Sequence, residues 1–448
     1  MYRKIRISLQ TLLYVFLALV PILPSYFTAL RGISVYYVIS AGFAALSLFF
    51  LKGRVRLLRP KSRVLTMFLV LWILAHSVSM ILTEGAFHLV MFLLITVVVF
   101  VFVSASVNTQ ESFIGSLHCL IYTSGVVAVF GLIEALTRFN VFSLLNNSGA
   151  TLNYSTERFG RVRLLSYSWQ AIVYGVYLMF CMILLLYCLQ FLKKKNAKFV
   201  VFISIYVLLW VNLLLTLSRS SIIAAVFANL LFLYFSGFVR MLKTILITVV
   251  CVAALVVLVA LVFPKAFDLM MKFYFMMVSL IDDSYASEIA ASFGTNLKAE
   301  GNRIDLYNWV FKSMKGKWLF GFGQHAQFEY PYKVTDGMYT WTVVKKGIEN
   351  NYLDTIYRYG LVGAIPEFCM YVSVLVYSFA HRAKASWEKS VSFNSAVFSV
   401  MLAYFLEMFA VNQSSDRMIF YPLIMLFLCY NIRNKFQTDY TEKRLNDA

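Results

Sequence analysis

Long apolar runs alternate with short polar segments along almost the whole chain. Each run is close to the ~20 residues that an α-helix needs to cross ~30 Å of hydrocarbon. The pattern predicts an all-α polytopic membrane protein with about twelve transmembrane helices, in which residues 1–448 form a single integral membrane domain. The predicted spans are 9–29, 33–51, 64–82, 86–106, 113–134, 169–192, 198–216, 220–236, 242–264, 356–379, 393–412 and 418–432.

Two of the segments between these runs are too long to be simple turns. Residues 135–168 form a basic loop that contains four arginines and one glutamate. Residues 265–348 lie between the ninth and tenth spans, and apolar side chains recur at helical spacing over 303–314. We therefore expect a long helical extracytoplasmic loop there, and we expect it to be the working part, because loops held by a rigid frame commonly bear function.

Composition and charge narrow the class of protein further. Hydrophobic residues make up 61% of the chain and charged residues only 14%, which is far from the balance of a soluble domain. The net charge of +19 could suggest nucleic acid as a partner. However, Lys and Arg concentrate in alternate short segments, most densely in 52–63, and this is the positive-inside pattern. It predicts both termini in the cytoplasm, contacts with anionic membrane lipid, and no nucleic acid.

No cofactor or metal site is expected from the sequence. The six cysteines all fall within predicted spans and form no CxxC pair, which indicates packing rather than disulfides or zinc. Asp282 and Asp283 are adjacent, but no further ligand follows at metal-binding spacing. Phosphate-binding, dinucleotide-binding and HExxH motifs are missing from the sequence.

Arginines at predicted outer positions suggest an anion site. Arg161 and Arg163 lie in the basic loop, where positive charge opposes the topology rule. Arg219 lies between the seventh and eighth spans and follows Ser218, so the positive end of a helix dipole adds to its charge. Arginine suits a diphosphate because its planar fork donates two parallel hydrogen bonds. The alternatives are a solvated basic loop and an interfacial arginine that marks a hairpin turn.

Three other buried polar residues stay open in interpretation. His76, Glu367 and Glu407 fall within predicted spans. His76 can be a buried, hydrogen-bonded histidine or can carry protons, and each glutamate can be a hydrogen-bonded residue between helices or part of the lining of a polar cavity.

Three segments, taken in their order along the chain, resemble the motifs of the O-antigen ligase/O-antigen polymerase superfamily of bacterial inner-membrane glycosyltransferases. The first, 216–219, reads Thr-Leu-Ser-Arg. The second joins Arg303 and Trp309 to 319–323, which reads Leu-Phe-Gly-Phe-Gly. The third joins 349–353, Glu-Asn-Asn-Tyr-Leu, to 359–363, Tyr-Gly-Leu-Val-Gly. The resemblance covers roughly 161–363.

This resemblance implies a GT-C-like fold in the bacterial inner membrane. It also implies transfer of an oligosaccharide from undecaprenyl diphosphate on the outer face, without nucleotide or metal. Arg219 and Arg303 match the essential arginines of the family and are implied to be catalytic. The substrate-binding residues that we expect are Ser218, Arg161, Arg163, Asn350, Asn351 and His325.

The chain departs from the ligase pattern at one position. Ligases of the family usually carry His-Asn where this chain has Glu349 and Asn350. Glu349 can take the role of the base, because a carboxylate beside sugar hydroxyls accepts a proton; His325 is the other candidate. The missing histidine favours a polymerase of O-antigen, capsule or exopolysaccharide over a ligase that transfers polymer to lipid A core or protein. A transporter of lipid-linked oligosaccharides is the third alternative, and a chain-length regulator is the expected protein partner of a polymerase.

Overall fold

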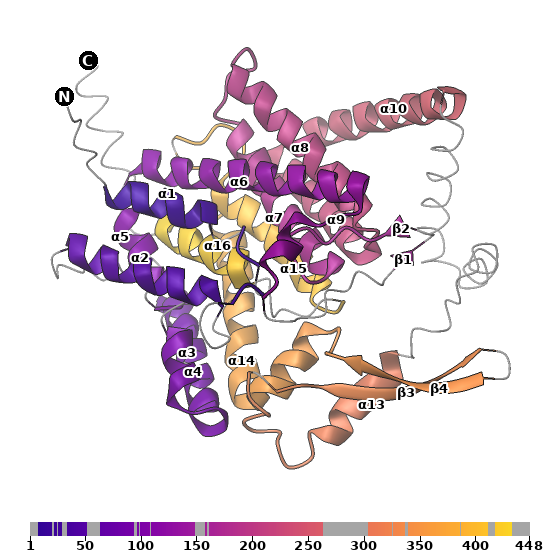
Figure 1. The fold of residues 1–448 in the computed structure, drawn as a ribbon. Coiled ribbons are helices and arrows are strands. Elements are labelled where there is room, and N and C mark those ends of the chain that lie inside the picture. Colours follow the sequence, from indigo (N-terminus) through magenta and orange to yellow (C-terminus); the bar gives the residue numbers. More distant parts are fainter. Residues whose placement is uncertain are drawn as a thin grey trace.

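The structure is a computed structural model that describes residues 8–19, 22–24, 26–28, 34–51, 63–93, 96–97, 99–107, 109–147, 157–158, 161–262, 303–324, 326–336, 339–385, 387–410 and 417–431. Most of these residues are helical (Figure 1). The elements are α1 (Leu9–Leu19), α2 (Val35–Leu51), α3 (Arg63–Thr83), α4 (Ala86–Leu93), α5 (Val99–Ser106), α6 (Gln110–Thr137), η3 (Val141–Leu145), β1 (Glu157–Arg158), β2 (Arg161–Val162), α7 (Ala171–Leu189), α8 (Ala197–Leu215), α9 (Arg219–Ser236), α10 (Phe238–Val262), α13 (Arg303–Ser313), β3 (Glu329–Asp336), β4 (Tyr339–Lys346), α14 (Asn351–Ala380), α15 (Phe393–Glu407) and α16 (Arg417–Tyr430).

Six of the described helices are long and apolar enough to cross a membrane, namely α3, α6, α7, α8, α9 and α14. Shorter apolar helices accompany them, among them α1 and α15. The protein is therefore a multi-pass helical membrane protein, and the finer count of twelve spans stays a prediction.

One predicted span differs from the helix in the structure. The helix α1 ends at Leu19, well before residue 29, because Pro21 follows and cannot continue the helix. In the predicted span 86–106 the structure describes α4 and α5, and residues 94, 95 and 98 between them lie outside the described part of the chain.

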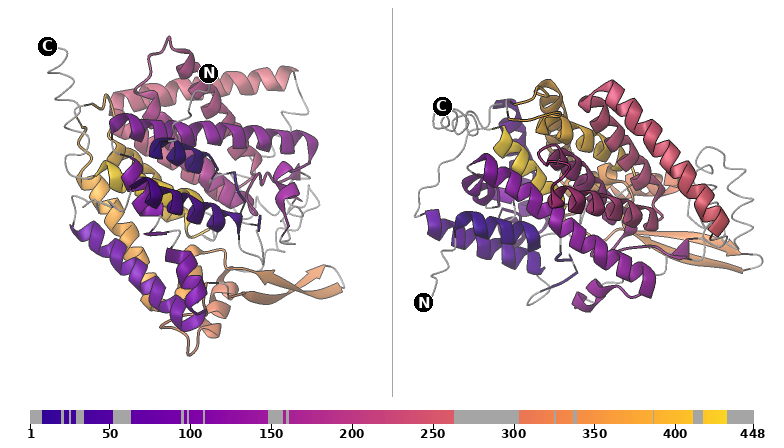
Figure 2. Two further views of the ribbon diagram at one scale, coloured as in Figure 1. Left: turned by 60° about the vertical axis from the view of Figure 1, so that its left-hand side comes forward. Right: turned by 90° about the horizontal axis from the view of Figure 1, so that it is seen from above.

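The long loop 265–348 is only partly helical, and this corrects the sequence prediction. The expected helix over 303–314 is present as α13. The strands β3 and β4 pair in antiparallel register from Glu329 opposite Lys346 to Asp336 opposite Tyr339. This hairpin projects beyond the helices (Figures 1 and 2). Residues 265–302 lie outside the described part of the chain.

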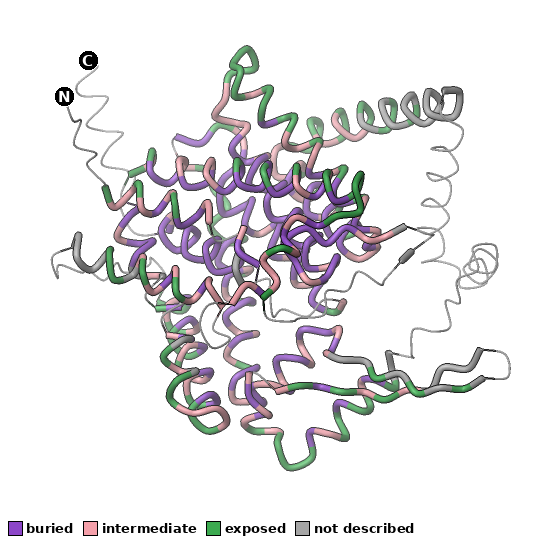
Figure 3. The backbone as a smooth tube through the Cα atoms, in the orientation of Figure 1, coloured by how far each residue is buried: buried purple, intermediate pink, exposed green. Residues whose placement is uncertain are grey.

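The core of the molecule surrounds α7, which is buried along almost its whole length (Figure 3). The helices α6, α8, α9 and α15 pack against it. In contrast, the described residues of α10 are mostly exposed along one edge of the bundle. A helix that is apolar all round and enclosed by other helices forms the rigid centre of a membrane bundle.

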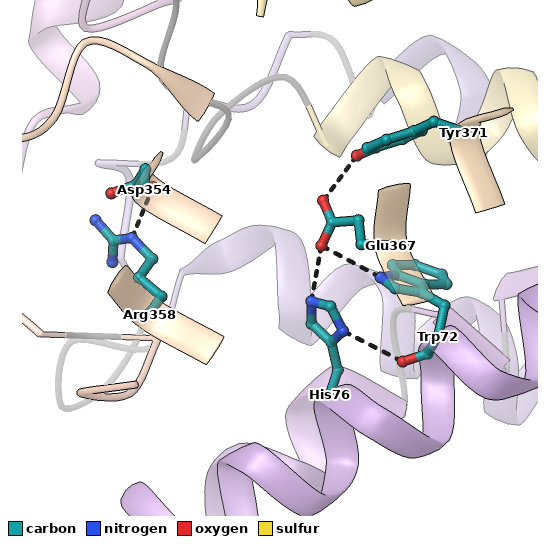
Figure 4. A network of polar contacts seen from close by, with 6 residues as sticks. All are labelled: Trp72, His76, Asp354, Arg358, Glu367 and Tyr371. Atoms are coloured by element: carbon teal, nitrogen blue, oxygen red, sulfur yellow. Dashed lines mark hydrogen bonds and ion pairs between the residues drawn. The ribbon is translucent and has the colours of Figure 1, made fainter. Parts of the chain in front are cut away.

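A second packing unit joins α14 to α3, which run side by side in Figures 1 and 2. His76 and Glu367 form a buried pair between them, with 2.8 Å from His76 Nε2 to Glu367 Oε2 (Figure 4). Trp72 Nε1 donates to the same oxygen at 3.4 Å, and the Tyr371 hydroxyl donates to Oε1 at 2.8 Å. His76 Nδ1 faces the Trp72 carbonyl at 3.2 Å. Both side chains therefore act here as hydrogen-bonded residues between helices.

We expect Glu367→Leu to lower the free energy of unfolding by about 3–5 kcal/mol, because it removes one partner of a buried pair. The Trp72 and His76 nitrogens would then be buried without their acceptor. The double variant His76→Leu/Glu367→Leu should recover most of this loss, since neither charge then stays unpaired. Unfolding of the four proteins in detergent measures the cycle; equal losses in the single and double variants would contradict a coupled pair.

A polar cluster closes the bundle end where α7 and α16 finish. Glu388, in the connection between α14 and α15, accepts hydrogen bonds from the hydroxyls of Tyr187 and Tyr430 at 2.8 and 3.0 Å. It also accepts from the backbone amides of Ala385 and Phe393. Burial raises the pKa of the Glu388 carboxyl above its ordinary value of 4.5. These four donors explain how a carboxyl group is accommodated there.

Candidate functional site

The other end of the bundle brings together the segments that the sequence analysis singled out. The N-termini of α7, α9 and α14 meet the C-termini of α6, α8 and α15 there. Glu134 near the end of α6 accepts from the backbone amides of Leu165 and Ser166 at 3.2 and 2.8 Å. These bonds fix the segment that leads into α7.

Arg163 lies against the hairpin between α8 and α9. Its Nε donates to the Thr216 carbonyl at 3.1 Å, and the backbone amide of Leu164 donates to the Leu215 carbonyl at 3.2 Å. Leu217 adopts a left-handed conformation with φ 51°, which turns the chain sharply between the two helices. Arg163 is therefore hydrogen-bonded to the residue before the turn, and Arg219 follows the turn in the sequence.

Ser218 is the N-cap residue of α9, and its side chain does not cap the helix. Instead, Ser218 Oγ lies 3.0 Å from Ser221 Oγ. Ser221 Oγ in turn donates to Glu407 Oε1 at 2.9 Å. Both serines are buried, so this chain of hydroxyls ties the start of α9 to the end of α15.

The next contacts extend from α15 to α14 and α13. The backbone amide of Asn351 donates to the Met408 carbonyl at 2.8 Å. Asn350 caps α14 by accepting from the Leu353 amide at 3.1 Å. Asn350 Nδ2 also donates to the Tyr307 hydroxyl at 3.3 Å. The helix that begins at Arg303 is thus held against the start of α14.

The two glycine-containing segments interlock. The helix α14 is kinked at Gly360, which has φ 64° and ψ −171°. The amides of Phe322 and Gly323 donate to the carbonyls of Tyr357 and Arg358, both at 2.9 Å. The amides of Leu361 and Val362 donate to the carbonyls of Trp318 and Leu319 at 2.8 and 3.1 Å. The loop before the hairpin therefore satisfies the backbone groups that the kink frees.

The predicted site residues do not all fall in the described part of the chain. Arg163, Ser218, Arg219, Asn350 and Asn351 lie in the chain of contacts described above, and Glu349 precedes Asn350 as a partly buried residue. Arg161 and Arg303 are described as backbone only, in β2 and as the first residue of α13. His325 lies outside the described residues. Those described residues contain no group of three or more His, Cys, Asp or Glu side chains that could hold a metal ion.

Three residues of this end were not assigned to the site from the sequence. Glu407 was considered only within its span, and Tyr307 only as part of an apolar helix face. Asp354 was not considered, although it lies four residues before Arg358, and Asp354 Oδ2 lies 2.8 Å from Arg358 Nε. A carboxylate and a guanidinium at this spacing on a helix are the signal that could have identified the last of these.

The fold and the contacts at the N-termini of α7, α9 and α14 together define a multi-pass helical membrane protein. Its polar loops and helix ends converge at this end of the bundle. Residues 204–366 match the sequence model of the Wzy_C family, described as O-antigen ligase. This stretch of the chain is thus similar to the O-antigen ligase (Wzy_C) domain family, a similarity that implies polysaccharide transfer of the O-antigen ligase or polymerase type. This confirms the resemblance inferred from the motifs. A search of curated proteins found no match.

Proposed function

We propose that the protein is a polysaccharide polymerase that transfers an oligosaccharide from undecaprenyl diphosphate to a hydroxyl of an acceptor sugar. The observation that carries this proposal is that two arginines meet at the N-terminus of α9. Arg163 donates a hydrogen bond to Thr216 in the turn before this helix, and Arg219 is the first residue of the helix. Guanidinium groups and a helix N-terminus both favour an anion. A diphosphate on a membrane carrier is an anion that reaches this end from the lipid.

Charge also explains how such a site would accelerate transfer. Negative charge develops on the leaving diphosphate, and fixed positive groups in a site of low dielectric stabilise it more than water does. Arg303 begins α13, which is held against α14 through Tyr307 and Asn350. In this proposal Arg303 supplies the second catalytic guanidinium, Arg161 and Arg163 bind the carrier, and Ser218 and Asn350 bind substrate.

Polymerase is favoured over ligase because Glu349 stands where ligases of the family usually carry a histidine. In this proposal both termini lie in the cytoplasm, so the N-terminus of α9 faces the outer side of the inner membrane. A chain-length regulator is the expected partner on that side. In this proposal the transfer needs no metal or nucleotide, because cleavage of the bond between the anomeric carbon and the diphosphate oxygen of the donor supplies the driving force.

The products that accumulate in a strain lacking the protein test this function. We expect loss of the polymerase to leave acceptors that carry one repeat unit at most. Long polymer retained on the carrier would instead indicate a ligase. Single repeats that accumulate facing the cytoplasm would indicate a transporter. Gel analysis of the glycolipids and extraction of the carrier distinguish the three outcomes.

A further inference from the structure

Two buried side chains at the start of α14 leave polar atoms without partners. Asn351 is 0% exposed, and neither Nδ2 nor Oδ1 has a hydrogen-bond partner. Asp354 is 3% exposed, and its Oδ1 has none. Within the part of the chain that the structure describes, no other buried side chain leaves two of its polar atoms unpartnered. Each such atom costs about 1–3 kcal/mol, so a native protein retains them for a reason.

The start of α14, which carries these atoms, is connected to the proposed site. Asn351 and Asp354 are three residues apart on one helix and therefore lie on the same face. The backbone of Asn351 is bonded to Met408, the residue after Glu407, and Glu407 is bonded to Ser221 of α9. The first residue of α14 is thus linked, through α15 and two hydrogen bonds, to the helix that carries Arg219.

Asp354 is also oriented as a base would be. Arg358 Nε holds Asp354 Oδ2 at 2.8 Å, and Arg358 Nη1 donates to the Gln324 carbonyl, so the carboxylate is fixed from one side (Figure 4). The other oxygen, Oδ1, takes no part in that ion pair. A base held by a second group, with one atom left for the proton that it takes, is the arrangement found in general-base sites. The Arg358 side chain is 18% exposed, so the pair lies just beneath the surface.

We propose that Asn351 and Asp354 form the subsite for the attacking hydroxyl of the acceptor sugar, and that Asp354 Oδ1 accepts its proton. This inference rests on the proposed function. An asparagine side chain offers a donor NH2 group and an acceptor oxygen, and a carboxylate only accepts, which matches a sugar hydroxyl and its neighbour. In the step, the acceptor oxygen bonds to the anomeric carbon of the donor, and the bond from that carbon to the diphosphate oxygen breaks. The diphosphate keeps the electron pair, and the hydroxyl proton passes to Asp354.

This assignment differs from the one made from the sequence, in which Glu349 is the base. Glu349 precedes the N-cap residue of α14 and is partly buried. Asp354 lies one turn inside the helix, where its position is set by the helix and by Arg358. A rigid element holds a reacting group more accurately than a loop does.

The test uses purified full-length protein in liposomes and the lipid-linked repeat unit extracted from the deletion strain as donor. Asp354→Asn keeps the shape of the side chain and removes the base, so we expect transfer to fall at least about 100-fold. Affinity for undecaprenyl diphosphate alone should stay within about threefold of wild type, because the guanidinium groups are untouched. Asn351→Ala should lower transfer about tenfold with the same unchanged affinity. Glu111→Gln changes an exposed carboxylate in the first turn of α6, at the other end of the bundle; it is the matched control and should retain most of the activity.

The proposal is overturned if Asp354→Asn transfers within about threefold of wild type, or if it loses diphosphate affinity and thermal stability together with transfer. In the first case another group takes the proton, and in the second Asp354 is structural. Neither result touches the proposed function, which fails if Arg219→Ala and Arg303→Ala also leave transfer intact, or if the deletion strain accumulates the products of a missing ligase or transporter.

Discussion

Arg219→Ala is expected to abolish chain extension while the protein still inserts and folds. Removal of one fixed donor to a developing negative charge typically costs a factor of about 10²–10³ in rate. Arg219 begins α9, so its loss also removes a positive charge that adds to the positive end of the helix dipole at the proposed diphosphate site. Arg219→Lys keeps the charge but loses the planar fork, and an intermediate rate is expected. Arg303→Ala should behave as Arg219→Ala does.

The matched control for these variants is Arg240→Ala. Arg240 is an exposed arginine near the start of α10, at the opposite end of α9. Its replacement should leave both polymer length and protein level unchanged. Polymer of wild-type length in cells that produce Arg219→Ala or Arg303→Ala would refute their assignment.

The second large effect is expected at the kink of α14. The conformation of Gly360, with φ 64° and ψ −171°, belongs to a region that only glycine populates. A Cβ there would also collide with the Leu319 carbonyl, and a Cβ at Gly321 would lie 2.5 Å from the Arg358 carbonyl oxygen. Gly360→Ala should therefore cost about 3 kcal/mol or more, because backbone strain and steric overlap add to each other.

Activity should fall together with stability in Gly360→Ala, since the kink holds the 318–323 loop that precedes the hairpin. Gly42→Ala is the control: Gly42 lies in α2, and a Cβ there has nothing within 4 Å. That variant should be neutral or stabilised by up to about 1 kcal/mol, as expected for alanine in place of a helical glycine. Thermal unfolding in detergent and transfer in liposomes measure both. A Gly360→Ala protein as stable as Gly42→Ala would contradict the interlocked arrangement.

The helices were largely predictable because apolar runs determine them directly. The predictions for α6, α7, α8 and α9 agree with the structure to within a few residues at each end. Gly321 and Gly323 lie in one of the segments that the sequence singled out, and both approach another residue closely, Gly321 the backbone of Arg358 and Gly323 the side chain of Glu84. The segment that pairs with these glycines could not be predicted from the sequence, because backbone hydrogen bonds do not depend on a pattern of side chains.

Two features were missed for different physical reasons. The hairpin had a local signal, because alternating aromatic and β-branched residues flank Asp336 and Gly337, a favoured turn pair. The hydrogen bond from Ser221 to Glu407 had none, since 186 positions separate the two residues and only the packing of α9 on α15 joins them. The same holds for the link from Asn351 to Met408.

The most direct test of the account is the side of the membrane that the turn before α9 faces. Ser220 is next to Arg219 and is partly buried, so Ser220→Cys in a protein without its native cysteines leaves the arginines in place. In right-side-out vesicles, an impermeant thiol reagent should label this cysteine directly and should be blocked by added undecaprenyl diphosphate. Labelling only after the membrane is opened, or labelling that the diphosphate does not affect, would contradict the account.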